Sequence, residues 1–460
     1  MADIHQRLAD LGTAVPEILL PKPGVDLEKW AVIACDQFTQ NRAYWEDAAA
    51  YVGDAPSTLS MIFPEVYLPE DGREERIRRI HAAMDRKLRE GFFAPPRRAC
   101  VYVERATPFH PCRRGLVLAV DLEQYDWKAE SRLLIRSTEG TLPERLPPRI
   151  AIRRGASLEI PHILLLINDE EDRLLSGLSG RARRKSPAYD TPLMMQSGHI
   201  KGWLLEEEED WAFLAQGLEA LAQQGQGQEQ LLQFQPQAPD TRPFLYAVGD
   251  GNHSLATAKA VWENYKREHR EPDLMNHPAR WALVEVENIY DPGLGFEPIH
   301  RVIFGVSPAE ILQALSALPD FSKRAIGSRA ELSRLIAEKG AAKNRLGLIT
   351  GTECTLLESN APGLATDSLQ PLLDTLILDQ KAQASEGSVS IDYIHGEEEL
   401  FSLTRASTQA VGLLLPPIEK RGLFETVSRS GPLPRKSFSM GEAEEKRFYL
   451  ECRRLFATGT

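Results

Sequence analysis

The stretch that decides the fold is YAVGDGNHSLATAKAVW, residues 246–262. An apolar, strand-like run ends at the turn 249–251, and a helical run rich in small residues follows it. The first turn of a helix has unpaired N–H groups and a partial positive charge, so a short polar loop leading into it favours an anion. This order of strand, glycine turn and helix is typical of an α/β protein.

The polar side chains at this transition predict a binding site. Gly251 allows close approach of a ligand, and Asn252 and Ser254 flank the histidine. Asp250 could cap the helix or hold a metal ion or a hydroxyl, and His253 could donate to an anion or carry a proton near neutral pH. The simpler alternative is a turn in which Asp250 or Asn252 only caps the helix.

Composition limits the classes of protein. The chain has 460 residues, 42% of them hydrophobic and 26% charged, which is typical of a soluble globular protein of two or three domains. No apolar window is long enough to span a membrane, and the start lacks a secretory signal, so we expect a cytoplasmic protein with no membrane partner. The five scattered cysteines predict no disulfide framework, and the net charge of −12 argues against bulk nucleic-acid binding.

Alternating strand-like and helix-like segments predict mixed sheets flanked by helices, with the motif loops converging on one cleft. Apolar runs predict strands within 99–106, 114–126, 131–137, 160–169 and 244–251. The glutamine-rich segment 222–243 predicts a linker or long loop. It would separate an N-terminal α/β domain, 1–221, from a C-terminal α/β domain, 244–460, that carries the DGNHS motif.

A second candidate segment is LIRSTEGTLPERLPPRIAIRRG, residues 134–155. Its guanidinium groups suit a phosphate or a carboxylate, and Arg136 and Arg149 are the candidates. Thr138 and Thr141 could bind the same anion, and Glu139, held among arginines, could act as a general base. The alternative is a solvated arginine face paired with nearby glutamates.

Three further stretches carry weaker signals. QSGHIKG offers His199 and Lys201 between glycines, either as an anion loop or as an exposed turn. AVIACDQFT places Asp36 directly after a short apolar strand. FEPIHRVIF contributes His300 and Arg301, where a histidine beside a strand is usually structural.

Together these stretches resemble a known family. WAVIACDQFT, STLSMIFPEVYLP, LIRSTEGT, SGHIKG, AVGDGNHSLATAK, FEPIHRVIF, DYIHGEEE and LPRKSFSMGEAEEKR occur in the order and spacing of the bacterial and archaeal family catalogued as domain of unknown function 1015. The resemblance runs from about residue 15 to 455. The more widespread branch of the family carries Asp-Gly-His-His-Arg where this chain has Asp250-Gly251-Asn252-His253-Ser254.

That box in turn resembles the Asp-Gly-His-x-Arg box of ParB and sulfiredoxin-like proteins, a group that includes nucleotide-binding partition proteins and free-serine kinases. The resemblance implies a ParB-like core, phosphate-site roles for Asp250 and His253, and Glu139 as the base toward a substrate hydroxyl. Ser254 replaces the arginine of the box, so Arg136 or Arg149 would have to supply that contact. Mg²⁺ and a nucleotide, ATP or ADP, are the cofactors that the resemblance implies.

Three functions are compatible with these observations. The first is phosphoryl-transfer or phosphoester chemistry on a small hydroxylated, anionic metabolite such as serine or phosphoserine. The second is a regulatory protein that binds a nucleotide or phosphometabolite without turnover, and the third is a ParB-like nucleic-acid-associated protein. The density of acid, base and anion-binding groups favours the enzyme. The sequence does not identify the metal or the substrate, and it leaves a homo-oligomer as one of the open oligomeric states.

Overall fold

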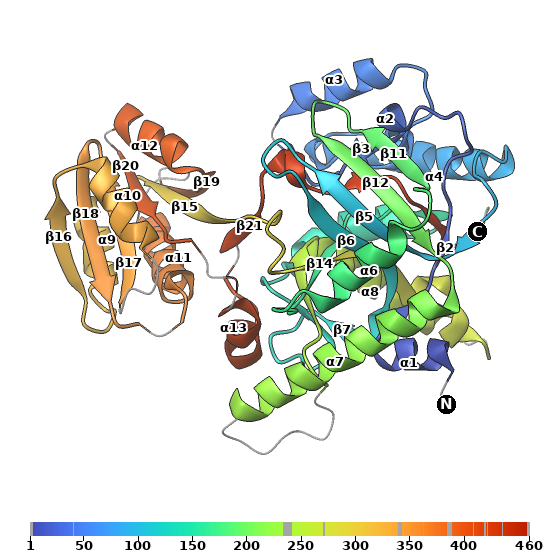
Figure 1. Ribbon diagram of the computed structural model, residues 1–460. Coiled ribbons are helices and arrows are strands. Elements are labelled where there is room, and N and C mark those ends of the chain that lie inside the picture. Colours follow the sequence, from blue (N-terminus) through green and yellow to red (C-terminus); the bar gives the residue numbers. More distant parts are fainter. Residues whose placement is uncertain are drawn as a thin grey trace. The chain divides into compact units, whose positions relative to one another are not determined.

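The computed structural model describes residues 3–39, 41–232, 242–269, 272–338, 343–361, 363–383, 389–407, 409–417, 420, 422–434 and 436–457. The chain forms two compact units. Unit 1 consists of Met1–Leu294 with Gly441–Thr460, and unit 2 consists of Gly295–Met440. The predicted mixed α/β class is confirmed, since both units combine helices with sheets (Figure 1).

Unit 1 is built on a mixed ten-stranded sheet. Its order is β11 (Tyr189–Pro192), β12 (His199–Leu205), β5 (Cys100–Ala106), β6 (Arg113–Asp121), β14 (Trp281–Asn288), β10 (Leu164–Ile167), β13 (Tyr246–Asp250), β8 (Ile135–Ser137) and β7 (Tyr125–Asp126), with β1 (Thr13–Ala14) beside β6. The pairs β10–β14, β13–β8 and β7–β8 are parallel, and the other pairs are antiparallel. The predicted strands all lie in this sheet.

Both faces of the sheet are covered, because alternate side chains enter two different cores. Tyr102 of β5 packs in one core, and its neighbours Val101 and Val103 pack in the other. The helices of unit 1 are α1 (Ile4–Asp10), α2 (Leu27–Trp30), α3 (Arg42–Val52), α4 (Arg73–Arg89), α5 (Leu146–Arg153), α6 (Arg173–Ala182), α7 (Glu208–Leu232) and α8 (Asn252–Glu268). Residues of α1, α6, α7 and α8 contribute to the first core, and residues of α2, α3 and α4 contribute to the second.

The predicted linker and domain boundary differ from the structure. Residues 222–232 continue helix α7, and residues 233–241 lie outside the described part of the chain. The two units divide after Leu294 rather than within 222–243. The reason is sheet pairing: β13 and β14 follow the predicted linker in sequence but enter the same sheet as β5 and β6.

The last segment of the chain returns to unit 1. Short strands β22 (Phe448–Tyr449) and β23 (Arg453–Arg454) pair with β3 (Val32–Ile33) and β9 (Leu158–Glu159), while β2 (Glu17–Ile18) pairs with β4 (Arg97–Arg98). Buried Arg447 is paired with two carboxylates, those of Glu285 and Glu451. An unpaired buried charge would be costly, so these ion pairs hold the segment in one register.

Unit 2 contains an antiparallel seven-stranded sheet. Its order is β16 (Ser322–Ile326), β18 (Glu353–Ser359), β17 (Asn344–Thr350), β20 (Ala410–Leu414), β15 (Phe296–Phe304) and β19 (Ser390–His395), with β21 (Phe438–Met440) on β15. Its helices are α9 (Pro308–Leu315), α10 (Arg329–Ala337), α11 (Ala365–Gln383), α12 (Glu397–Ala406) and α13 (Gly422–Ser430). None of the helices described in either unit is long and apolar enough to cross a lipid bilayer.

Candidate functional site

The junction between β13 and α8 has the geometry of an anion site. Gly251 precedes α8 with a φ of +81°, a left-handed conformation that favours glycine. The side chain of Asp250 accepts a hydrogen bond from the Gly251 N–H at 3.0 Å, and no side chain caps the helix. Because Gly251 has no side chain, the residue before the helix supplies no acceptor to the N–H groups of the first turn.

The loop after β8 lies against this junction. β8 and β13 are parallel and pair Ser137 with Val248, so their carboxyl ends lie at the same edge of the sheet. In the loop, the Leu142 N–H donates to His253 Nε2 at 3.3 Å. This bond places the loop that carries Glu139 next to His253 of α8, and the sequence analysis predicted this proximity. The catalytic role of Glu139 stays a prediction.

Two buried polar atoms flank that hydrogen bond. Among the described residues, Thr141 Oγ1 and Asn252 Oδ1 have no hydrogen-bond partner. Thr141 directly precedes Leu142 in the sequence, and Asn252 directly precedes His253, the two residues that this bond joins. A buried polar atom without a partner costs free energy, so these two atoms mark a place where a polar ligand would be stabilised.

A lysine from the last segment of the chain reaches the junction. Lys446 is buried, and its Nζ lies 3.2 Å from Asp250 Oδ2. The sequence analysis did not select Lys446, because nothing in the pattern of GEAEEKR shows which carboxylate it meets. It places a positive charge next to the uncapped start of α8.

A second group of contacts is centred on His162, which the sequence analysis also missed. His162 Nε2 lies 2.7 Å from Ser254 Oγ and 3.7 Å from Asp36 Oδ2, and His162 Nδ1 lies 2.8 Å from Tyr449 Oη. Tyr449 Oη in turn accepts from the Cys35 N–H at 3.1 Å. His162 directly precedes the apolar run of β10, and this position at a strand end is a signal that could have identified it. The contacts unite Asp36 and Ser254, two predicted site residues.

Arg149 reaches the same region but is already paired. Its Nε and Nη2 bind the two carboxylate oxygens of Glu65 at 2.8 and 2.5 Å, and its Nη1 donates to the Arg145 carbonyl at 2.7 Å. Burial raises the pKa of Glu65 and the Asp36 charge adds to this, while Arg149 acts in the opposite direction. Arg149 thus pairs with a glutamate, as the alternative interpretation of these arginines expected. The glutamate is Glu65, which comes from a distant segment of the chain.

Two other predicted residues of this segment serve the fold. Arg136 is buried, donates to the carbonyls of Leu133 and Arg242 at 3.0 and 2.9 Å, and stacks on Phe244. Thr138 is buried and donates to the Val248 carbonyl at 2.5 Å, which ties the loop to β13. The pairing of β8 with β13 buries both residues, and the role of Arg136 and Thr138 in anion binding stays a prediction.

His199 and Lys201 do not join the site. Both side chains are half-buried on β12 and pair with Asp190, at 3.0 and 2.8 Å. Four strands separate β12 from β13 in the sheet, a distance of roughly 24 Å at about 4.8 Å per strand. The spacing of glycines around them suggested an anion loop, but the segment forms one strand of a hairpin.

His300 and Arg301 belong to the core of unit 2. His300 Nδ1 accepts from the Leu415 N–H at 3.1 Å, and burial lowers its pKa to about 4. Arg301 binds Gln370 at 3.2 Å and the Ile299 carbonyl, and it stacks on Tyr393. These contacts lie within unit 2 and stabilise its packing, and the binding role of His300 and Arg301 stays a prediction.

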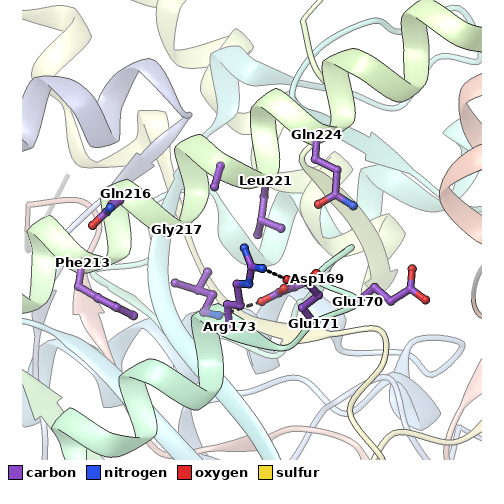
Figure 2. A pocket seen from close by; sticks show the side chains of 11 residues that line it. Asp169, Glu170, Glu171, Arg173, Phe213, Gln216, Gly217, Leu221 and Gln224 are labelled. Carbon is purple, nitrogen blue, oxygen red and sulfur yellow. Dashed lines mark hydrogen bonds and ion pairs between the residues drawn. The ribbon is translucent and has the colours of Figure 1, made fainter.

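The surface also has a pocket of about 690 Å³, between α6 and α7 (Figure 2). Asp169, Glu170, Glu171 and Arg173 line one side of it, and Phe213 and Gln224 are among the residues of α7 that line the other. It contains none of the predicted site residues. In the described part of the chain, no cluster of three or more His, Cys, Asp or Glu side chains is arranged to hold a metal ion.

Fold and site together define a mixed α/β protein whose polar side chains gather where two parallel strands end. The chain belongs to the DUF1015 family of proteins of unknown function, whose family model matches residues 19–376. The predicted family is thereby confirmed. No curated protein matches the chain.

Several solved structures resemble the chain. A conserved hypothetical protein from Pyrococcus furiosus is 11% identical with a TM-score of 0.36, and the match covers 74% of this chain and 94% of that one. A free serine kinase in complex with AMP is 11% identical with a TM-score of 0.37, covering 73% and 90%. SbnI with a C-terminal truncation, from Staphylococcus aureus, is 12% identical with a TM-score of 0.35, covering 71% and 82%. TM-scores below 0.5 are too low to transfer a residue's role to this chain, and these comparisons do not support the ParB resemblance.

Proposed function

We propose that this protein is an enzyme of phosphoryl transfer or phosphoester chemistry that acts on a small hydroxylated, anionic metabolite. The junction of β13 and α8 binds the phosphate group in this proposal. Asp250 and His253 belong to the phosphate site, and Glu139 takes the proton from the substrate hydroxyl. Serine and phosphoserine are the first substrates to test.

The observation that carries the proposal is the start of α8, which has no side-chain cap from Gly251 and where the buried atoms Thr141 Oγ1 and Asn252 Oδ1 find no hydrogen-bond partner among the described residues. Helix N–H groups, the Thr141 hydroxyl and the side-chain amide of Asn252 can all donate to phosphate oxygens once the amide is oriented for it. The buried ammonium of Lys446 adds positive charge at the same junction. A phosphate bound there would satisfy groups that the folded chain leaves unsatisfied.

A nucleotide with Mg²⁺ fits the chemistry of this junction. Mg²⁺ in phosphoryl-transfer enzymes is usually held by one or two carboxylates together with the phosphates of the substrate. Asp250 is the last residue of β13, and Glu139 lies in the loop that follows the adjacent strand β8. When bound, Mg²⁺ would neutralise phosphate charge, since the Lys446 ammonium is already paired with the Asp250 carboxylate.

The test begins with binding and continues with turnover. Inorganic phosphate, sulfate, AMP, ADP and ATP are titrated calorimetrically into the full-length protein, with and without Mg²⁺, and ATP is then assayed with serine for ADP release. We expect binding of the phosphate-bearing ligands, weakened in Asn252→Leu and Thr141→Val, and turnover with at least one hydroxylated acceptor. Binding without turnover would support a regulatory protein, and no binding would overturn the phosphate site.

A further inference from the structure

Ser254, His162 and Tyr449 form a continuous hydrogen-bonded chain. Ser254 lies in the first turn of α8, His162 lies just before β10, and Tyr449 lies on β22. Ser254 Oγ is 2.7 Å from His162 Nε2, and His162 Nδ1 is 2.8 Å from Tyr449 Oη. A hydroxyl within reach of an imidazole that is oriented by a third group is the arrangement of an activated nucleophile.

The partners of Tyr449 are compatible with the tautomer that this role requires. Tyr449 Oη accepts from the Cys35 N–H at 3.1 Å, and the Cys35 side chain also interacts with this hydroxyl. A phenol oxygen can accept two hydrogen bonds, so one lone pair is left for His162 Nδ1–H. Nε2 then presents its lone pair to the Ser254 hydroxyl. Burial raises the pKa of Tyr449 well above its usual value, so Tyr449 stays a neutral hydroxyl.

Asp36 supplies the charge that the reaction needs. Asp36 Oδ2 lies 3.7 Å from His162 Nε2, and both side chains are largely buried. When His162 takes a proton it becomes an imidazolium, and a carboxylate at this distance stabilises that charge. Asp36 is therefore a positioning and charge-balancing residue, whereas Ser254 and His162 meet the reacting atoms.

We propose that Ser254 is a nucleophile that carries the phosphoryl group during transfer, with His162 as its base. This inference rests on the proposed function, because the phosphoryl donor has to bind at the start of α8. Ser254 is the third residue of that helix, so its hydroxyl belongs to the turn whose N–H groups would hold the phosphate oxygens. The donor class is a nucleoside triphosphate.

The proposed transfer takes place in two steps, and atoms and charges balance in each. First, Ser254 Oγ forms a bond to the γ-phosphorus, the bond to the nucleoside diphosphate breaks, and the Ser254 proton passes to His162 Nε2. Second, the acceptor oxygen bonds to phosphorus, Ser254 Oγ leaves and regains its proton from His162, and the acceptor proton passes to Glu139 and then to water. The sum is transfer of one phosphoryl group and release of one proton.

The experiment traps the intermediate. Full-length protein is incubated with Mg²⁺ and ATP labelled at the γ-phosphate, without acceptor, and the labelled peptide is identified by mass spectrometry. We expect phosphoserine at Ser254, none in Ser254→Ala, and phosphothreonine in Ser254→Thr, which keeps the hydroxyl. In His162→Gln the rate of labelling should fall by roughly 10² to 10⁴ at neutral pH and partly recover as the pH rises, because hydroxide replaces the lost base.

Two controls separate this role from folding. Ser316→Ala removes an exposed hydroxyl on unit 2 that bonds to the Gln313 carbonyl, and His5→Gln changes a histidine on α1. Both controls should label like the wild type, and melting curves should show that all variants fold. A Ser254→Ala enzyme that releases ADP at the wild-type rate, or a label on another residue, would overturn the nucleophile and leave the proposed function intact. A wild-type protein that neither binds ATP nor releases ADP would overturn both.

Discussion

Lys446 holds its ammonium 3.2 Å from the carboxylate of Asp250, although the two residues come from opposite sides of unit 2 in the sequence. The pair joins the end of β13 to the segment that also carries Tyr449. One ion pair therefore connects the turn proposed to bind phosphate with the segment that carries Tyr449, the neighbour of His162. The chemistry of the site depends on the return of this last segment to unit 1.

Lys446→Met should abolish most of the stabilisation by phosphate. The change removes the positive charge at the start of α8, and loss of a partner for partly buried Asp250 should lower the free energy of unfolding by about 1–3 kcal/mol. Ligand bound to the folded state raises the melting temperature, so the rise with added phosphate measures the site. Lys323→Met, at an exposed position on β16, should keep the full rise. An unchanged rise in Lys446→Met would remove Lys446 from the site.

Gly251→Ala should weaken both the fold and the phosphate site. A left-handed φ costs a residue with a side chain about 1–2 kcal/mol, and the added Cβ would lie 3.2 Å from Ile163 Cα. Gly72 is a matched control, because it precedes α4 with the same φ of +81° and nothing lies within 4 Å of its Cβ position. Gly72→Ala should lose stability but not phosphate affinity, as judged by calorimetry. Equal phosphate affinity in both variants would contradict this assignment.

Glu139→Gln should separate binding from chemistry. The amide keeps the shape of the side chain but cannot take the proton of a substrate hydroxyl, so turnover should fall by roughly 10² to 10⁴ while ligand binding persists. Glu144→Gln, an exposed position on the same segment, is the control and should retain full turnover. Single-turnover rates are measured beside calorimetric binding for both variants. Loss of binding in Glu139→Gln would assign Glu139 to ligand recognition instead of proton transfer.

Glu287 should make the stability of unit 1 depend on pH. Burial raises its pKa to about 7, the nearby Glu285 and Asp291 charges add to this, and Arg113, 2.8 Å away, opposes it. An unfolded glutamate has a pKa near about 4.3, so between these values the folded state binds the proton that the unfolded state has lost. Its contribution is present below about pH 4 and is lost as the pH rises through 7.

Glu287→Gln should remove this dependence. Denaturant unfolding at pH 5 and pH 8 should therefore show the variant gaining stability relative to the wild type as the pH rises. Glu46→Gln on the surface of α3 serves as the control and should follow the wild type at both values. The opposite sign, or no pH effect on the difference, would show that Glu287 is charged in the folded state throughout.

Local conformation was predictable because neighbours in the sequence decide it. The apolar runs around Tyr102 and Leu165 predicted buried strands, and the glycine at 251 predicted the break between β13 and α8. The polar loops at the ends of β8 and β13 were also predictable, since parallel strands bring their carboxyl ends to one edge. Asp36, Glu139, His253 and Ser254 were selected on such local grounds.

Only the tertiary structure decided which charges and hydroxyls meet. Arg149 was expected to bind an anion but pairs with Glu65, because a carboxylate beside a partly buried guanidinium offsets the cost of burying its charge. His199 has the same local signals as His253, yet four strands of the sheet lie between its strand, β12, and β13. Lys446 and Tyr449 enter the site through a chain return that no local pattern encodes. The sequence alone determined the helices, the strands and the turn that could hold an anion. Burial and strand order determined which side chains pair, because the free energy of a pair depends on distances that only the folded chain sets.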